Sequence, residues 1–546
     1  MKARTVRGMA GATAAAVIVT GAAACSAPGG GAAAGAGAAD SVVVGIATEP
    51  ESLSPLLGYG KDGNSKIFDG LLAHDADMKL KPALAEALPE VSADGLTYTY
   101  ALRRDVRFSD GQPFGAKDVV FTYRTILDAK TNNASKSELD AIADVTARGD
   151  EAVVFTLKYP YAPFAERTVL PIAPEHLAGG QDVNSGDFTT KPVGTGPYML
   201  SAWSKGEKLS FKANPAYWGG EPAVKKFTMA VIKDDDVRAT RLRSGELDGA
   251  VLPPNLAKGF AAGKAGEAAG QADKAGRNMK TYAAKSFDYR NVTLPTEHPV
   301  TGDTAVRQAL DIAVDRATMV DKILEGAGKA AYGPVPTGSP WFAAGTERPY
   351  DLARAKKILD DAGWIPGADG IRVKNGVRAA FPLWYTSGDK LRQDHALAFA
   401  SDAKKAGVQV TTESGSWEVI EPRMRTDAVL AGGGSPADPD FDQYLTLNSA
   451  LAGDGFNNMA RYANPAVDKA LLDGRRSADP AARKAAYDTV QRELVKDPGY
   501  VYLTHIDHLY VVADKWDGPT TQVEPHDHGL GTGPWWNIES WKPKQK

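Results

Sequence analysis

Residues 96–127 read LTYTYALRRDVRFSDGQPFGAKDVVFTYRTIL. The first seven residues are β-branched or aromatic in alternation, which predicts a β-strand. The SDGQP run at 109–113 predicts a turn, because glycine tolerates a positive φ and proline cannot continue a strand. Residues 116–127 carry apolar side chains at helical spacing, with Asp118 in the first turn, so a helix should follow. Strand, turn and helix thus succeed one another within this one stretch.

The rest of the chain alternates in the same way. Strands are predicted at 41–46, 153–157 and 208–212, and helices at 305–324, 352–361 (ended by Gly363), 395–405 and 480–495; residues 500–512 predict a strand or a pair of strands. Mixed strands and helices over 546 residues indicate several α/β or α+β lobes. At roughly 100–200 residues per domain, we expect about two to four of them.

The charge balance and the hydrophobic content of the chain exclude several classes of function. The chain has 63 Lys and Arg against 67 Asp and Glu, a formal net charge of −4. This balance argues against a nucleic-acid clamp or a polybasic membrane-surface protein, both of which need a concentrated positive field. Hydrophobic residues make up 43%, enough for large cores and incompatible with wholesale disorder.

The N-terminus has the pattern of an export signal. Lys2, Arg4 and Arg7 precede a long uncharged stretch, and residues 22–25 read AAAC. A charged start, an apolar middle and a small-residue exit predict a signal peptide over 1–24. Small residues before a lone cysteine resemble a bacterial lipobox, so we expect lipidation at Cys25 and a Gly/Ala-rich tether over 25–40. The alternative is an ordinary secretory signal with an incidental cysteine.

The sequence carries no familiar catalytic signature. It has no G-x-x-x-x-G-K-[ST] loop, no G-x-S-x-G elbow and no H-E-x-x-H pair. We therefore expect no enzyme activity and no cofactor. His526 and His528 could share one face of an extended segment and bind a transition metal. A solvated polar loop is the simpler interpretation, and we prefer it.

Several stretches resemble one family in the order in which they occur. They are 82–88 (PALAEAL), 92–100 (SADGLTYTY), 102–113 (LRRDVRFSDGQP), 116–123 (AKDVVFTY), 193–198 (VGTGPY), 214–219 (NPAYWG), 243–248 (RSGELD), 306–310 (VRQAL) with Asp315 and Arg316, and Tyr350 and Asp351 leading to Ala362, Gly363 and Trp364. The family is the peptide/nickel class of substrate-binding proteins that feed ABC importers, solute-binding protein family 5. The resemblance spans essentially all of 41–546.

The resemblance implies a mixed α/β fold of the periplasmic-binding-protein type II, class C, with two main hinged lobes and an extra inserted domain. Lobe I would comprise 41–72, 191–290 and 511–546, lobe II 73–190, and lobe III 291–510. The implied function is capture of a solute outside the cell by lobe closure, followed by delivery to the permease and ATPase subunits. The protein would act as a monomer, held on the membrane by its lipid anchor, without nucleic acid.

The ligand is harder to predict. In peptide-binding members, an acidic residue pairs with the peptide amine just ahead of a D-P stretch. The corresponding run, LAGGGSPADPDF at 430–441, has Asp438 and Asp440 on the D-P part and Ser435 at the amine position. Serine cannot supply a counter-charge for a buried ammonium. This argues against free-amine dipeptides, whereas oligopeptides held through backbone hydrogen bonds remain open.

Other candidate ligand-binding residues are aromatic or basic: Trp417, Trp384, Tyr385 and Arg392. The resemblance suggests a cleft position for Trp417 and a carboxylate-binding role near Arg392, although each aromatic could equally be core. Oligopeptide is the leading ligand class, and a nickel chelate or an oligosaccharide is the alternative. An exported hydrolase and a surface module that binds partner proteins also remain open.

Overall fold

The structure, a computed structural model, describes residues 40–133, 136–260, 277–526 and 531–545. The predicted signal peptide, Cys25 and the tether up to residue 39 lie outside these ranges, as does His528. Across the described residues, none of the helices combines the length and hydrophobicity that crossing a bilayer requires.

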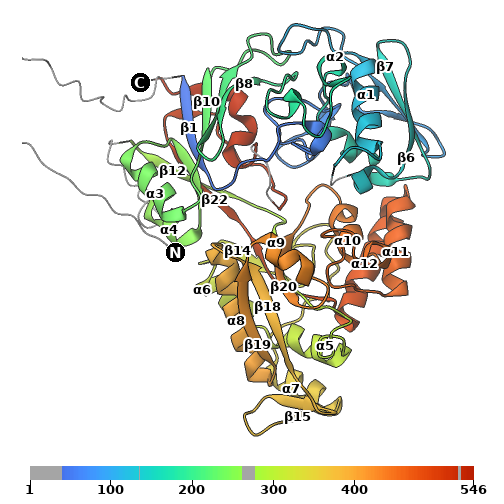
Figure 1. Ribbon diagram of the computed structural model, residues 1–546, viewed down its shortest axis with the longest axis vertical. Coiled ribbons are helices and arrows are strands. Elements are labelled where there is room, and N and C mark those ends of the chain that lie inside the picture. Colours follow the sequence, from blue (N-terminus) through green and yellow to red (C-terminus); the bar gives the residue numbers. More distant parts are fainter. Residues whose placement is uncertain (1–39, 134–135, 261–276, 527–530, 546) are drawn as a thin grey trace, which may run out of the picture. The chain divides into compact units, whose positions relative to one another are not determined.

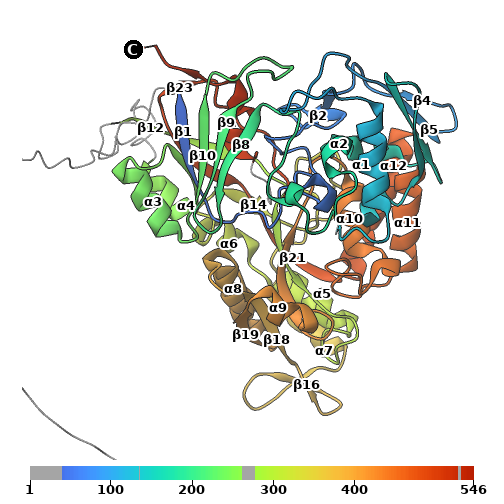
Figure 2. The ribbon, with the colours of Figure 1, turned by 45° about the horizontal axis from the view of Figure 1, so that its top comes forward.

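A seven-stranded sheet is built around β1, which is rich in valine (Figures 1 and 2). Its order is β12 (Met279–Ala284), β22 (His508–Ala513), β11 (Gly249–Leu252), β1 (Ser41–Ile46), β10 (Lys226–Val231), β9 (Lys208–Ala213) and β8 (Tyr198–Ser204). β1 runs parallel to β10 and β11, and the outer strands pair antiparallel. The predicted strands at 41–46 and 208–212 are confirmed.

A six-stranded sheet contains the most buried strands. Its order is β14 (Gly328–Ala330), β21 (Tyr500–Ile506), β13 (Tyr289–Thr293), β20 (Ala428–Gly433), β18 (Ala380–Thr386) and β19 (Gln409–Gly415). Every residue of β13 and β21 is buried. Helix α8 (Lys390–Ala406) packs along β18 and β19 (Figure 1).

The strand, turn and helix predicted for 96–127 are confirmed in a four-stranded sheet. Its order is β4 (Glu90–Val91), β5 (Thr97–Ala101), β7 (Ala152–Leu157) and β6 (Ile142–Ala147), with α1 (Ala116–Leu127) packed on β6 and β7. Gly111 has φ +90° in the turn, where the Asp110 carboxylate accepts from the Gln112 N–H at 3.0 Å. Tyr123 of α1 meets Phe155 of β7 edge to face, with ring centroids 4.8 Å apart.

The remaining elements are small sheets and helices. The strands are β2 (Leu72–His74), β3 (Leu80–Pro82), β15 (Ile365–Pro366), β16 (Arg372–Lys374), β17 (Val377–Arg378), β23 (Trp516–Asp517) and β24 (Lys542–Pro543). The helices are α2 (Glu175–Ala178), α3 (Asp235–Ser244), α4 (Pro254–Ala257), α5 (Thr304–Ala313), α6 (Arg316–Lys322), α7 (Leu352–Asp361), α9 (Trp417–Ile420), α10 (Pro439–Leu447), α11 (Pro465–Arg476) and α12 (Pro480–Lys496). The predicted helices at 352–361 and 480–495 are confirmed, whereas α8 begins at Lys390 rather than at 395.

The single helix predicted over 305–324 is wrong. The chain forms α5 and α6, separated by Val314 in an extended conformation (φ −87°, ψ 123°). Asp315 caps α6, because its side chain accepts from the Thr318 N–H at 3.0 Å. The break lets Arg316 reach the carbonyl oxygens of Ala331 and Tyr502 at 2.8 and 2.7 Å. Apolar periodicity predicted one helix because these tertiary acceptors leave no trace in the local pattern.

One antiparallel ribbon runs through both large sheets. β12 pairs with β22 in the seven-stranded sheet, and their continuations β13 and β21 pair in the six-stranded sheet. Between the sheets, the Ile506 N–H donates to the Asp288 carbonyl at 2.8 Å, and the Ser286 hydroxyl donates to the Ile506 carbonyl at 2.5 Å. Residues 500–512 therefore form a pair of strands that divides between two sheets.

Substituting Asp311 should destabilise the six-stranded sheet and its helices. Asp311 is 1% exposed and neutralises Arg316 (2.5 Å) and Arg348. Removing the carboxylate leaves two buried guanidinium groups without a counter-charge, so Asp311→Ala should lower the free energy of unfolding by about 3–5 kcal/mol. Urea denaturation followed by tryptophan fluorescence measures the change. Asp321→Ala, which removes an exposed carboxylate paired with Lys322, is the control and should leave the midpoint unchanged; equal midpoints for both variants would contradict the assignment.

Candidate functional site

A cavity of about 1010 Å³ is lined from both large sheets. One side includes the end of β1, the loop that follows it, β11, β22 and η8 (Gly533–Ser540), and Lys61 and Glu138 also line the cavity. The other side consists of β13, β20, β21 and the helices α8, α9 and α10. Clefts that bind small molecules usually measure about 300–1,000 Å³, so this cavity is at the upper end of that range.

The backbone of β20 offers a free edge to this cavity. β13 pairs with β20 from Leu430 to Gly433, whereas β18 pairs with it only at Ala428 and Val429. Among the described strands, none pairs with residues 431–433 on the β18 side, and all three line the cavity. An extended ligand can therefore form strand-like hydrogen bonds at this edge without reading side chains.

Glycines at the end of β20 leave room for neighbouring polar groups. A Cβ on Gly433 would lie 2.5 Å from the Tyr289 hydroxyl and 2.9 Å from an Asp442 oxygen. Gly434 has φ +125°, and a Cβ there would lie 2.0 Å from the Phe287 carbonyl oxygen. Any larger residue would displace these groups or strain the turn, so the glycine run is a requirement of the site's geometry.

An aromatic pair lines the cavity at the start of α9. Trp417 is the first residue of this helix, and its ring meets Phe456 edge to face, with centroids 5.2 Å apart. Phe456 is 52% exposed, although it borders a cavity. An exposed aromatic face in such a place can cover an apolar or planar part of a ligand.

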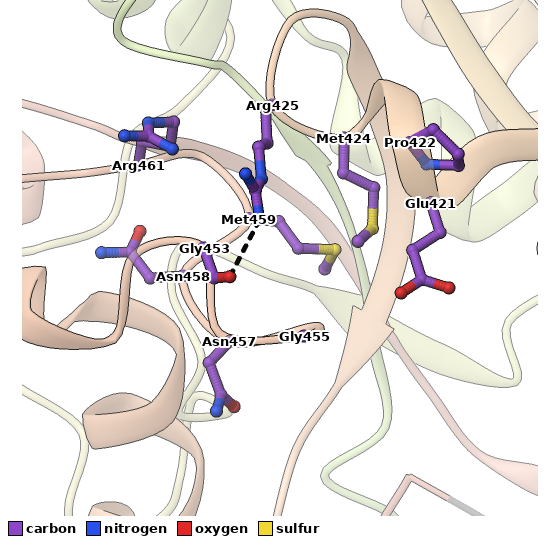
Figure 3. A pocket seen from close by; sticks show the side chains of 10 residues that line it. All are labelled: Glu421, Pro422, Met424, Arg425, Gly453, Gly455, Asn457, Asn458, Met459 and Arg461. Carbon is purple, nitrogen blue, oxygen red and sulfur yellow. Dashed lines mark hydrogen bonds between the residues drawn. The ribbon is translucent and has the colours of Figure 1, made fainter.

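A second cavity of about 310 Å³ adjoins the first at Met459, which lines both (Figure 3). Arg425 borders it and donates from Nη2 to the Gly453 carbonyl at 3.0 Å. The adjoining cavity can accommodate a ligand that extends past Trp417 and Phe456.

Arg392 brings a positive charge to the main cavity from the first turn of α8. Its Nη1 donates to Asp389 at 2.7 Å and to the Thr386 hydroxyl at 3.3 Å. Its Nε is buried and has no hydrogen-bond partner among the described residues. Burial and the nearby charge of Arg290 lower the pKa of Arg392. The guanidinium is therefore incompletely paired and suited to a carboxylate.

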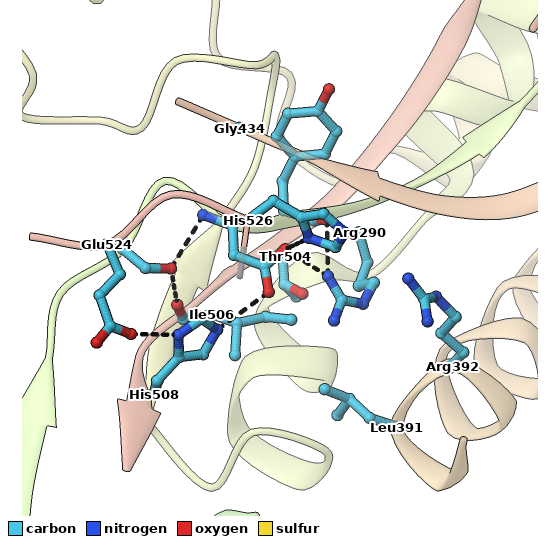
Figure 4. A network of polar contacts seen from close by, with 12 residues as sticks. Arg290, Leu391, Arg392, Gly434, Thr504, Ile506, His508, Glu524 and His526 are labelled. Atoms are coloured by element: carbon cyan, nitrogen blue, oxygen red, sulfur yellow. Dashed lines mark hydrogen bonds and ion pairs between the residues drawn. The ribbon is translucent and has the colours of Figure 1, made fainter. Parts of the chain in front are cut away.

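A charged network lies where the ribbon passes between the sheets (Figure 4). His508 contacts Asp288 through Nε2 at 3.1 Å and Glu524 through Nδ1 at 2.5 Å. Asp288 also meets His526 at 2.6 Å and Arg290 at 2.5 Å. These contacts join β13, β22 and the C-terminal segment to one another.

The protonation of His508 follows from its two carboxylate partners. Burial opposes a charge, but the hydrogen bonds to Asp288 and Glu524 outweigh it and raise the pKa of His508 to about 10. The same cluster holds the pKa of Asp288 well below its ordinary value despite burial, chiefly through Arg290. Burial lowers the pKa of His526, so the two histidines have opposite tendencies.

No group of three or more His, Cys, Asp or Glu side chains among the described residues has an arrangement that could hold a metal ion. His526 lines the main cavity, and His528 lies outside the described residues, so neither the preferred polar loop nor the alternative of a shared metal site at these two histidines is tested.

The candidate residues from the sequence fall into two groups. Trp417 and Arg392 line the main cavity, and Ser435 lines two smaller cavities beside it. The other four do not line the main cavity. Asp438 is buried and pairs with Arg483 at 2.7 Å. Asp440 is buried and lies 2.9 Å from the Tyr161 hydroxyl and 3.3 Å from Arg475. Trp384 donates to Asp427 at 2.9 Å, and Tyr385 packs on the core of the six-stranded sheet.

Sequence reasoning missed Asp442, on α10. This half-buried carboxylate lines the main cavity and accepts from the Tyr289 hydroxyl and the Gly434 N–H, each at 3.0 Å. Its two partners belong to other elements, so no local sequence signal distinguishes it from Asp438 and Asp440.

Comparisons with known proteins identify the class of protein. The family model for bacterial extracellular solute-binding proteins, family 5, matches residues 79–468. The chain is 66% identical over 487 residues to Protein XP55 of Streptomyces lividans, covering 89% of this chain and 87% of that protein. The match to the family model shows that this chain belongs to the bacterial extracellular solute-binding proteins, family 5.

Solved structures agree with the fold. NikZ from Campylobacter jejuni in complex with Ni(L-His) is 28% identical with a TM-score of 0.82, covering 92% of this chain and 99% of that one. The oligopeptide-binding protein AppA from Bacillus subtilis in complex with a nonapeptide is 26% identical with a TM-score of 0.79, with the same coverage. The predicted family and the mixed periplasmic-binding-protein fold are thus confirmed.

The His508 network predicts a loss of stability at alkaline pH. The pKa of His508 is about 10 in the folded protein and about 6.5 when unfolded, so its contribution is complete below pH 6.5 and disappears as the pH rises through 10. Asp288 stays ionised throughout this window, because its pKa is depressed. His508→Gln should lower the free energy of unfolding at pH 7 by about 2–4 kcal/mol and by much less at pH 10.

Urea denaturation at pH 7 and pH 10 measures this difference. The control is His176→Gln, which removes a histidine paired with Asp110 at 2.7 Å away from both large sheets. His176→Gln should change the free energy of unfolding little at either pH. An equal loss for His508→Gln at both pH values would show that His508 is not charged in the folded protein.

Proposed function

We propose that this protein is the extracytoplasmic binding component of an ABC importer, which captures oligopeptides and delivers them unchanged to its permease. The observation that carries the proposal is the main cavity, which both large sheets line and which contains the free edge of β20. Backbone pairing at such an edge accepts many sequences, as a peptide importer requires. Proteolysis or another covalent step has no role in this function.

Lobe closure around the ligand is part of the proposal. Lobe I would comprise 41–72, 191–290 and 511–546, lobe II 73–190, and lobe III 291–510. Apart from β13 (Tyr289–Thr293) and β22 (His508–Ala513), which cross the bounds at 290 and 510, the strands of each of the three larger sheets come from one lobe, which supports the division. Two chain crossings, between β12 and β13 and between β21 and β22, would act as the hinge.

The location follows from the N-terminal sequence. We propose export through the signal peptide 1–24, lipidation at Cys25 and a tether over 25–40 that holds a monomeric binding protein near its permease. Metabolic labelling with a palmitate analogue, compared between the wild type and Cys25→Ser, tests the anchor. Labelling that survives in Cys25→Ser would contradict it.

A nickel chelate is the second candidate ligand. The likeness to NikZ, which was solved with Ni(L-His), favours it, as does the position of His526 in the cavity wall. The described residues offer no three-residue metal cluster, so most ligands of the metal would come from the chelator. Mass spectrometry of small molecules that co-purify with the protein distinguishes peptides from chelates.

Arg392 should determine the preference for a free carboxylate. In titrations followed by tryptophan fluorescence, Arg392→Gln should weaken the binding of peptides with a free C-terminus by roughly tenfold or more. The affinity for the same peptides with an amidated C-terminus should change little. Lys390→Gln, an exposed residue of the same helix turn, is the matched control.

Two outcomes distinguish a failure of the role assigned to Arg392 from a failure of the peptide assignment. Equal losses for acid and amide peptides would contradict the role of Arg392 but keep the peptide ligand. If no peptide changes the fluorescence or the melting temperature of the wild type, whereas nickel chelates do, the peptide assignment itself fails.

A further inference from the structure

Three carboxylates follow one another at the start of α10, and their surroundings differ. Asp438 pairs with Arg483 at 2.7 and 2.8 Å, and Asp440 lies 3.3 Å from Arg475. Both of these carboxylates are more than nine-tenths buried and have their charge compensated within the protein. Asp442 differs, because it faces the cavity and no cation is paired with it among the described residues.

The donors to Asp442 hold its carboxylate in one orientation without neutralising it. The Tyr289 hydroxyl lies 3.0 Å from each oxygen, and the Gly434 N–H donates to Oδ1 at 3.0 Å. Oδ2 therefore has a tyrosine hydroxyl as its only donor in the described part of the chain. The absence of a side chain on Gly433 leaves space directly beside the carboxylate, because a Cβ there would lie 2.9 Å from Oδ1.

Asp442 also lies where two cavities meet. Five residues line both the main cavity and a neighbouring one of about 290 Å³: Lys61, Glu138, Gly433, Asp442 and His526. The nearby lysine is already paired, since Lys61 lies 3.0 Å from Asp62 and 3.3 Å from Glu138. A charge entering from either cavity would therefore meet a carboxylate that no lysine or arginine of the described ranges neutralises.

We propose that Asp442 pairs with a cationic group of the ligand, an ammonium or a guanidinium, and so supplies the counter-charge that Ser435 cannot. This inference rests on the proposed function and names one determinant of its specificity. A buried cation requires a partner charge, and a preoriented carboxylate between neutral donors provides one. With Arg392 in the same cavity, the site has one group for each end of a zwitterionic ligand.

Electrostatics agree with this geometry. Burial raises the pKa of Asp442 to about 7, against the effect of the Tyr289 and Gly434 donors. The other titratable groups that face it are Tyr289 and, on β21, Tyr500 and Tyr502, all of which have raised pKa values, together with His526, Lys61 and Glu138. The pKa of Asp442 is thus raised into the neutral range, whereas the three tyrosines have raised pKa values and His526 has a lowered one.

A cationic ligand should therefore bind more weakly as the pH falls. Binding favours the ionised carboxylate, so a proton must leave Asp442 below pH 7, and the affinity should drop roughly tenfold between pH 7 and pH 5.5. Peptide amines stay protonated over this window, with a pKa of about 8, so the ligand's own charge does not change.

The test compares matched peptides that differ only at the amine. Isothermal titration of the wild type with a free-amine peptide and its N-acetyl form should show a preference for the free amine of roughly tenfold or more at pH 7.5. Asp442→Asn, which removes the charge and keeps one acceptor oxygen for the Tyr289 hydroxyl and the Gly434 N–H, should abolish the preference and the pH dependence. Asp140→Asn is the control, since Asp140 accepts from Tyr159 at 2.9 Å and does not line the cavity.

Each outcome decides the proposal. A free-amine preference that disappears in Asp442→Asn, with unchanged melting temperature, supports it. Equal binding of both peptides, or a preference that survives in Asp442→Asn, overturns it and leaves the peptide function intact. If neither peptide binds the wild type, this proposal and the peptide assignment fail together.

Discussion

The antiparallel ribbon that passes from one large sheet into the other is the constraint on which the site depends. β12 and β22 belong to the seven-stranded sheet, and β13 and β21 continue them into the six-stranded sheet. Because the two crossings are hydrogen-bonded to each other, they position both walls of the main cavity together. The charged network around Asp288 and His508 lies at this crossing and satisfies buried groups that water would otherwise have to reach.

Buried charge has two separate uses in this molecule. Asp311, Asp438 and Asp440 neutralise arginines that organise helices, and their removal leaves uncompensated cations inside the protein. Arg392 and Asp442 differ because both line the main cavity, and the hydrogen bonds of the described residues do not fully satisfy or neutralise them. Such incomplete pairing favours ligand binding, because a ligand can supply the missing hydrogen bonds or counter-charges.

The elements that could be predicted correctly from the sequence are those whose residue pattern is contained in one short stretch of chain. The stretch 96–127 contains its own alternation, turn residues and helical periodicity, so its strand and helix could be located without tertiary information. The break between α5 and α6 could not, because Arg316 is held by carbonyl oxygens from β21 and from the chain after β14. The family and its fold followed from motifs in a fixed order, which is a resemblance rather than a physical derivation.

The candidate site was harder to predict for the same reason. Asp438 and Asp440 attract attention in the sequence as part of a D-P motif, yet arginines from α11 and α12 occupy both. The significance of Asp442 depends on Tyr289, which lies 153 positions earlier in the chain. Only the fold places this tyrosine beside a helix turn and a glycine, so the sequence could not separate three similar carboxylates.

The glycine run at the end of β20 brings an unpaired strand edge and the Asp442 carboxylate close together. Residues 431–433 present a strand edge, Gly433 makes space beside Asp442, and Gly434 donates to that same carboxylate. A peptide that pairs with this edge would thereby bring its end groups past a carboxylate whose position the same backbone determines. A side chain at Gly433 would disturb both the strand edge and the carboxylate, because they share one turn of chain. Under the proposed function, general affinity through the backbone and selectivity through charge would arise from the same few residues.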